Sequence, residues 1–266
     1  MTYFAFLGLF LVVPISAALI YFAARRKGSG LPPRLTALRP IAAIAITALV
    51  AVIYTTPWDN YLVASGVWGY PRSQVSGVIL GYVPLEEYLF FVLQTVLTSL
   101  GLIWVAGRSR RAESGPPARL RLWAALPLLM LWVIACAALA GPWGPWRYSV
   151  LLLAWALPPI LIQVIFGADL LWQERRIALS TIVAATLYYS LADIFAVSAG
   201  TWDFNPALIF GVRLGPLPVE EILFFLLTNV LIVFSVTLLL STASMERFRS
   251  GVARVRGAVA GARAAK

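Results

Sequence analysis

The stretch Pro84-Leu-Glu-Glu-Tyr-Leu-Phe-Phe91 decides the fold, because the chain repeats it as Pro218-Val-Glu-Glu-Ile-Leu-Phe-Phe225. The two octets are 134 residues apart, and this offset holds without a gap over residues 59–97 and 193–231. In that window 17 of 39 positions are identical, so the chain contains an internal repeat. The repeat matters because the chain has only 11 acidic residues, and the two Glu pairs supply four of them.

The composition is that of a polytopic membrane protein. The 266 residues are 61% hydrophobic and 12% charged, whereas soluble domains carry about 25% charged residues. Seven apolar runs are long enough to cross a bilayer, at roughly 3–23, 40–57, 84–106, 122–140, 148–168, 177–198 and 217–240. We therefore expect an all-α fold with about seven transmembrane helices, the first of them retained rather than cleaved.

Positive charge is concentrated on one side of the predicted membrane. Of the 21 Lys and Arg residues, 18 lie after the first, third, fifth and seventh runs, and only Arg72, Arg147 and Arg213 lie on the other side. The positive-inside rule then predicts a multi-pass cell-membrane protein with its N-terminus outside and its C-terminus in the cytoplasm. This distribution explains the net charge of +10 without a nucleic-acid partner.

The repeat predicts two halves of parallel topology. The second and third runs correspond to the sixth and seventh, the first matches the fifth loosely, and the fourth is a linker helix. With three helices per repeat and one linker, both repeats enter the membrane in the same direction. We expect a first repeat at 1–110, a linker at 111–146, a second repeat at 147–242 and a basic cytoplasmic tail at 243–266. The tail is expected to lie on anionic lipid or to be disordered.

The acidic residues are the main candidates for chemistry, because carboxylates at membrane depth are costly. Acids in the first turn of a helix are also favoured by the helix dipole, but this explains two adjacent acids poorly. Adjacent helical positions point about 100° apart, so one Glu of each pair can enter a cavity while its neighbour points elsewhere. The candidates are Glu86, Glu87, Glu220, Glu221, and the equivalent pair Asp59 and Asp193. Each Asp could instead cap a turn.

Aromatic residues flank both acidic sets and are candidates for binding a substrate. They are Trp58, Trp68, Phe90, Phe91, Trp202, Phe224 and Phe225. Most such residues form interfacial belts in membrane proteins. Those near the acids could instead line a pocket whose π-faces stabilise a cation.

The chain lacks the residues that several classes of catalysis and binding require. The chain has no His and a single Cys136, which removes imidazole catalysis, imidazole metal sites and disulfides. It has no Gly-rich dinucleotide fingerprint and no dense Asp-rich motif for Mg²⁺ and diphosphate. We expect no cofactor and no metal.

Pro57-Trp-Asp-Asn-Tyr61, Gly66-Val-Trp68 and the two octets together resemble the membrane-integral lycopene cyclases. In some members two small subunits form a heterodimer, and in others the halves are fused, as here. The resemblance covers about residues 1–240, with Val219 where Leu is common. It implies cyclisation of the linear end groups of lycopene, by way of γ-carotene to β-carotene. The family's link to membrane prenyltransferases adds the expectation of a membrane-prenyltransferase-like fold.

The implied reaction is a redox-neutral isomerisation that needs an acid, a base and a dry cavity. Glu86 and Glu220, facing each other, could share a proton, and one of them or Asp59 could be the base. The implied partners are lycopene, other linear carotenoids and the bilayer. A transporter or a lipid prenyltransferase is the alternative. The ring type, the choice within each Glu pair and the oligomeric state stay open.

Overall fold

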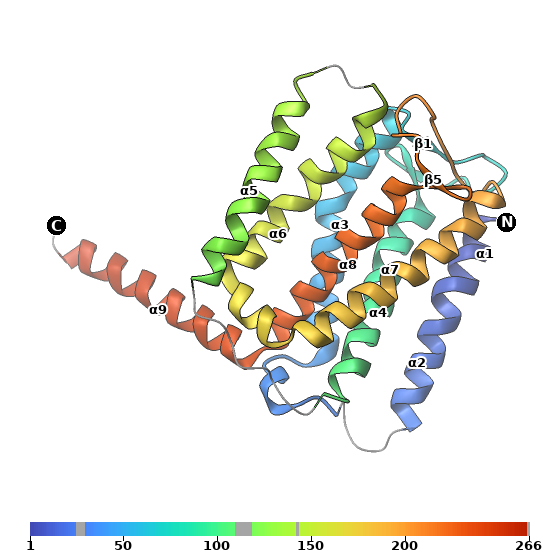
Figure 1. Ribbon diagram of the computed structural model, residues 1–266. Helices are drawn as coiled ribbons and strands as arrows, with labels where there is room; N and C mark the ends of the chain where they lie inside the picture. Colours follow the sequence, from blue (N-terminus) through green and yellow to red (C-terminus); the bar gives the residue numbers. More distant parts are fainter. Residues whose placement is uncertain (25–29, 110–118, 142–143, 265–266) are drawn as a thin grey trace.

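The computed structural model describes residues 1–24, 30–109, 119–141 and 144–264, with side chains described to residue 257. This described part contains seven helical spans apolar and long enough to cross a membrane, which confirms the predicted all-α class (Figure 1). The 22-residue spans are about 33 Å long at 1.5 Å per residue, close to the thickness of a hydrocarbon core. The spans are α1 (Tyr3–Leu7) with η1 (Gly8–Val12) and α2 (Val13–Ala24), α3 (Pro40–Ala64), α4 (Leu85–Ala106), α5 (Leu120–Ala138), η3 (Gly144–Trp146) with α6 (Arg147–Gln173), α7 (Arg175–Ser198) and α8 (Val219–Leu240).

The end of α3 differs from the prediction. The second run was expected to end at Pro57, but the helix continues to Ala64. Transmembrane helices tolerate proline because neighbouring helices compensate for the lost hydrogen bond. The indole N–H of the next residue, Trp58, donates to the Leu151 carbonyl of α6 at 3.1 Å and joins this part of α3 to α6. Asp59 is therefore a buried helical residue, and its interpretation as a loop cap is wrong.

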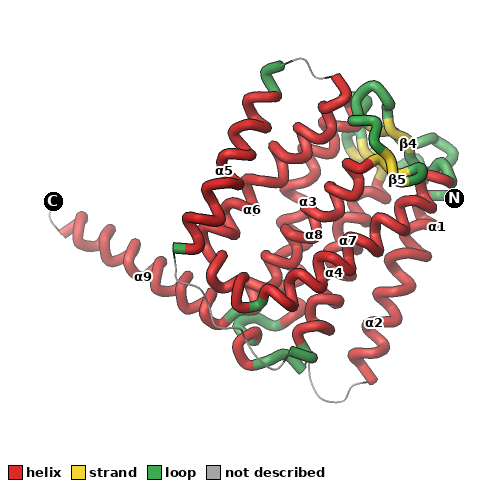
Figure 2. The backbone as a smooth tube through the Cα atoms, viewed as in Figure 1, coloured by secondary structure: helices red, strands yellow, loops and turns green. Residues whose placement is uncertain are grey.

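Short hairpins precede α4 and α8 at the same end of the bundle (Figure 2). β2 (Ile79–Leu80) pairs with β3 (Val83–Pro84), and β5 (Arg213–Leu214) pairs with β6 (Leu217–Pro218). Gly81 and Gly215 open the tight turns with φ of 73° and 63°, which glycine adopts without steric cost. Each octet therefore begins in a hairpin, and its proline precedes the first helical residue.

A contact between the two halves gives the repeat its symmetry. β1 (Trp68–Gly69) pairs antiparallel with β4 (Asp203–Phe204), with Gly69 opposite Asp203. These two residues are equivalent at the offset of 134. A segment that pairs antiparallel with its own equivalent lies on a two-fold axis, so the two halves are related by a pseudo-two-fold.

The same symmetry relates the first span to α6. The Tyr54 hydroxyl of α3 donates to the Trp155 carbonyl at 2.8 Å, and the Tyr188 hydroxyl of α7 donates to the Phe10 carbonyl at 2.7 Å. Tyr54 and Tyr188 are 134 residues apart, whereas Phe10 and Trp155 are 145 apart. The loose match between these spans is therefore a true equivalence at a longer offset.

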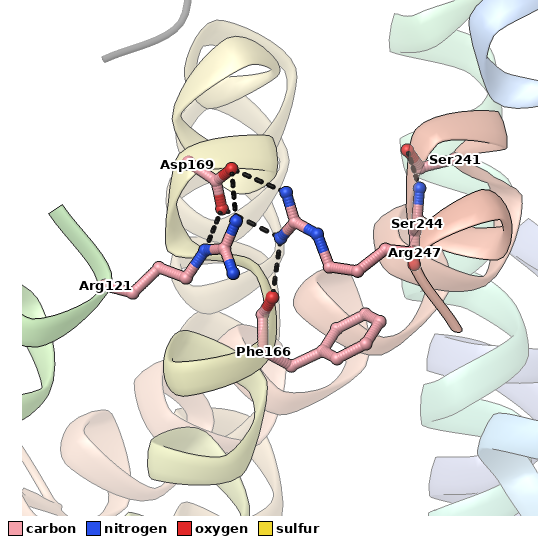
Figure 3. Close-up of polar contacts among 6 residues, drawn as sticks. All are labelled: Arg121, Phe166, Asp169, Ser241, Ser244 and Arg247. Atoms are coloured by element: carbon pink, nitrogen blue, oxygen red, sulfur yellow. Dashed lines mark hydrogen bonds and ion pairs between the residues drawn. The ribbon is translucent and has the colours of Figure 1, made fainter. Parts of the chain in front are cut away.

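The tail forms a helix, α9 (Thr242–Ala264), which projects away from the bundle (Figure 1). Its disorder was one of two expectations, and that expectation is wrong over these residues. Arg247 of α9 and Arg121 of α5 both contact the Asp169 carboxylate of α6, at 2.6 Å and 2.8 Å (Figure 3). The Phe166 carbonyl also accepts a hydrogen bond from Arg247 at 2.7 Å. The cluster fixes the base of α9 to the bundle.

Part of the predicted organisation lies outside the described residues. This holds for most of the polar junction at 107–119 and for several basic residues used to assign orientation, namely Arg25, Arg26, Lys27, Arg110, Arg111 and Lys266. A short helix, η2 (Pro33–Leu35), is described before α3. Arg34 of this helix forms an ion pair with Glu174 at 2.6 Å.

Candidate active site

The first Glu of each octet ties a loop to the start of a helix. Glu86 Oε1 accepts a hydrogen bond from the Ser76 backbone N–H at 2.6 Å, and Glu220 Oε1 accepts one from the Phe210 N–H at 2.5 Å. Ser76 and Phe210 are equivalent in the repeat. Neither Glu lines the central cavity in the described part of the chain. The expectation that Glu86 and Glu220 face each other there is therefore wrong.

The second Glu of each octet points into the cavity. Glu87 Oε2 accepts hydrogen bonds from the hydroxyls of Tyr3 at 2.5 Å and Tyr70 at 2.8 Å. Glu221 Oε1 accepts one from the Tyr148 hydroxyl at 2.6 Å. Tyr3 and Tyr148 are equivalent at the offset of 145, so the two halves repeat the same carboxyl–phenol pair. The rotation between adjacent helical positions separates this role from that of the first Glu.

Asp59 and Asp193 complete a set of four buried carboxyls. Their exposed fractions are 1% and 0%. Neither oxygen of Asp59 has a hydrogen-bond partner among the described residues, and its carboxyl interacts electrostatically with Glu87. Asp193 lies beside the Trp202 indole and the Glu221 carboxyl but forms no well-aligned hydrogen bond within the described chain. Each half therefore contributes one Asp and one Glu to the same region.

The cavity beside these carboxyls is small and mostly aromatic, and three of them, Asp59, Glu87 and Glu221, line it while Asp193 does not. Its volume is about 40 Å³, which holds only a few water molecules. No Lys or Arg is among its described lining residues. Those residues are Tyr3, Trp58, Asp59, Trp68, Tyr70, Glu87, Phe90, Phe91, Tyr148, Trp202, Phe204, Glu221, Phe224 and Phe225. Aromatic faces around acidic groups in a water-poor space provide a site that can stabilise a carbocation.

Tyr70 links the loop after α3 to the carboxyl of Glu87. The Trp68 indole N–H donates to the Tyr70 hydroxyl at 3.0 Å, and that hydroxyl donates onward to Glu87. Burial, followed by the nearby Glu87 carboxyl, raises the pKa of the Tyr70 phenol well above its usual value. Tyr70 therefore remains a hydrogen-bond donor throughout the physiological pH range.

All seven aromatic residues named from the sequence line this cavity. Four further lining residues were not among the substrate-binding candidates, namely Tyr3, Tyr70, Tyr148 and Phe204. The two equivalent phenols would have been found by aligning the first and fifth runs on Tyr3 and Tyr148, which needs the longer offset. The equivalent of Tyr70 in the other half is Phe204, which has no hydroxyl, so the repeat did not mark Tyr70 as a conserved polar position of the two halves.

This chain is similar to proteins of one family. The family model described as lycopene cyclase matches residues 1–105 and 145–239. A lycopene beta-cyclase of Halobacterium salinarum is 35% identical over 233 residues, which are 87% of this chain and 92% of that protein. A bifunctional lycopene cyclase/phytoene synthase of Leptosphaeria maculans is 37% identical over 72% of this chain and 35% of its own length. One of Phaffia rhodozyma is 33% identical over 73% of this chain and 31% of its own. No solved structure gives a significant match.

Proposed function

The chain belongs to the lycopene cyclase family, and we propose that it is a lycopene β-cyclase that converts the linear end groups of lycopene into rings. The observation that carries this proposal is an aromatic cavity lined by three buried carboxyls, those of Asp59, Glu87 and Glu221, with the buried Asp193 carboxyl beside Glu221. The substrate is a hydrocarbon dissolved in the bilayer, which suits a site inside a bundle of apolar helices.

The reaction moves protons without any net gain or loss. A carboxylic acid gives its proton to the terminal double bond of the substrate, and a cation forms at the adjacent carbon. A second double bond attacks that cation and closes the ring, which moves the positive charge onto the ring. A carboxylate then removes a ring proton and restores a double bond.

Hydrogen bonding divides these roles between Asp59 and Glu87. Donors that face a carboxyl stabilise its charged form, and burial without donors favours the neutral form. Glu87 receives two phenol hydrogen bonds, which suits the carboxylate that removes the ring proton. Asp59 has no hydrogen-bond partner among the described residues, which suits the acid that donates the first proton. Passing a proton from Glu87 to Asp59 resets the site.

The aromatic lining serves the cationic intermediate. Trp58 stacks on Phe224 with ring centroids 6.1 Å apart and an interplanar angle of 4°. Faces of this kind stabilise a nearby positive charge, and their packing excludes the water that would otherwise add to the cation. Glu221 and Asp193 provide the equivalent carboxyl pair on the other side of the pseudo-two-fold.

Expression in cells that accumulate lycopene tests the activity. We expect the pigment to change from lycopene to γ- and β-carotene. Persistence of lycopene in the presence of verified, membrane-inserted protein would contradict the proposal.

The proposed orientation has the N-terminus and the hairpins outside and α9 in the cytoplasm. The described residues Arg34, Arg108, Arg121, Arg175 and Arg247 lie at or beyond the helix ends remote from the hairpins, which supports this orientation through the positive-inside rule. A fluorescent protein fused after Lys266 should fluoresce, whereas an alkaline phosphatase fused there should be inactive. The opposite pattern would reverse the assignment.

A further inference from the structure

Two grooves on opposite flanks of the bundle are related by the pseudo-two-fold. The α3–α6 groove, about 400 Å³, lies between α3, α4, α6 and α8. The α2–α7 groove, about 320 Å³, lies between α2, α7 and α4. Ala51 and Leu231 line the first groove, and their equivalents Ala185 and Leu97 line the second. Pro159 and Pro14 are likewise equivalent at the offset of 145.

The α3–α6 groove faces the bilayer. Val50 and Ile162 line it and are 57% and 69% exposed, on helices long and apolar enough to cross a membrane. Its lining is mostly aliphatic and aromatic, without Lys, Arg, Asp or Glu among the described residues. A surface of this composition fits a hydrocarbon chain rather than a polar solute.

The α3–α6 groove also reaches the central cavity. Phe91 and Phe224 line both spaces, so these two side chains form the partition between them. Among described residues, the α2–α7 groove shares no lining residue with the cavity. Equivalent grooves thus differ in whether they lead to the carboxyls.

A difference between the two halves of the repeat explains why only the α3–α6 groove adjoins the cavity. Thr55 lines the α3–α6 groove, and its equivalent in the other half is the larger Tyr189. The Tyr189 ring stacks on Phe225 at 5.7 Å, and its hydroxyl donates to the Gln94 carbonyl at 3.2 Å. Phe225 is the equivalent of Phe91, so Tyr189 packs on the aromatic residue whose equivalent lines the α3–α6 groove.

We propose that the α3–α6 groove binds the polyene chain of the linear substrate while its end group passes between Phe91 and Phe224 to the central carboxyls. This inference rests on the proposed cyclase function. The central cavity of about 40 Å³ is far too small for a forty-carbon hydrocarbon, so most of the substrate lies elsewhere during the reaction. The groove is the described apolar space that adjoins the cavity and opens to lipid.

A matched pair of substitutions tests the groove. Ala51→Trp fills the α3–α6 groove, and Ala185→Trp places the same bulk at the equivalent position of the α2–α7 groove. Both positions are partly buried. Purified variants are reconstituted in lipid vesicles that contain lycopene, and initial rates of γ- and β-carotene formation are measured. We expect Ala51→Trp to lose activity by about tenfold or more and Ala185→Trp to stay within about twofold of wild type.

The possible results distinguish failure of the groove assignment from failure of the proposed cyclase function. Inactive wild-type protein would contradict the cyclase itself. An active wild type with equal losses in both variants, or a larger loss in Ala185→Trp, would overturn the groove assignment and leave the cyclase intact. If Ala51→Trp does not yield monodisperse protein, Val50→Trp and Ala184→Trp form a second pair that places the bulk on the outer wall of each groove. The ratio of their two initial rates then decides in the same way.

Discussion

At the scale of single residues, the two acids of each octet have separate tasks. Glu86 and Glu220 hold loop backbone amides, whereas Glu87 and Glu221 accept phenol hydrogen bonds inside the cavity. The arrangement explains why two adjacent acids occur in both halves of an acid-poor chain. A single helix-start acid would satisfy the loop but leave the cavity without its carboxyl.

This division of tasks predicts different results for two neighbouring substitutions. Glu87→Gln removes the proposed proton acceptor and should lower the rate of cyclisation by at least about 100-fold. Glu86→Gln keeps an oxygen that can accept the Ser76 N–H, and we expect it to retain most of the activity. Carotenoid formation per amount of inserted protein is the measurement. Activity in Glu87→Gln together with inactivity in Glu86→Gln would reverse the assignment.

The Tyr70 phenol makes folding stability depend on pH at alkaline values. Because its pKa is raised in the folded protein, its stabilising contribution is complete below about pH 10 and is lost as the pH rises toward the folded pKa. Melting temperatures in detergent between pH 8 and 11 should therefore fall less steeply for Tyr70→Phe than for wild type. Tyr82→Phe removes an exposed phenol from the same loop and serves as the control. Equal slopes for Tyr70→Phe and wild type would contradict this prediction.

At the scale of helices and loops, three elements meet at one carboxylate. Asp169 follows Gly167, where α6 departs from helical geometry, and it accepts hydrogen bonds from arginines of α5 and α9. α9 also begins with a local cap, since the Ser244 backbone N–H donates to Ser241 Oγ at 3.3 Å (Figure 3). The ion pair between Arg247 and Asp169 therefore contributes to the position of α9.

Loss of that ion pair should loosen α9 without altering the site. Arg247→Gln should lower the free energy of unfolding by about 1 to 3 kcal/mol, because it removes charge-assisted hydrogen bonds to Asp169. It should also increase proteolytic cleavage within 248–264. Arg249→Gln changes an exposed arginine two residues away and should behave as wild type. Similar protease sensitivity of the two variants would argue against a specific role for the ion pair.

At the scale of the whole molecule, one cavity is built jointly by two halves. Its carboxyl lining comes from Asp59 and Glu87 of the first half and Glu221 of the second. Antiparallel pairing of β1 with β4 and a hydrogen bond from Gln94 to Thr228, which are equivalent residues 3.0 Å apart, join the halves at the axis. Neither half alone supplies all the described residues that line the cavity.

Separate expression of the halves should reproduce this dependence. We expect fragments 1–113 and 114–266 to be inactive alone and to restore cyclisation when they are expressed together. Pigment analysis gives the activity, and co-purification through a tag on one fragment shows whether they associate. Cyclisation by either fragment alone would contradict a jointly built site.

The sequence predicted the spans, the repeat and the aromatic lining because each depends on local composition or on the constant offset. It could not choose within each Glu pair, because the rotation of α4 and α8 about their axes is set by packing against the other helices. It did not reveal Tyr3 and Tyr148, because their equivalence requires an offset of 145 instead of 134. The end of α3 was misplaced because Pro57 resembles a helix terminus, whereas neighbouring helices allow the helix to continue.

The self-equivalent pairing of β1 with β4 has an evolutionary consequence. A contact in which a segment meets its own equivalent is the kind that two identical chains form when they close into a dimer. If the halves were identical chains, every substitution would be copied to both sides, and a tyrosine at the position of Thr55 would separate both grooves from the central cavity at once. Duplication followed by fusion removes that constraint. A fused chain can keep the proposed entrance on one side and cover its equivalent on the other, while both halves retain their acids.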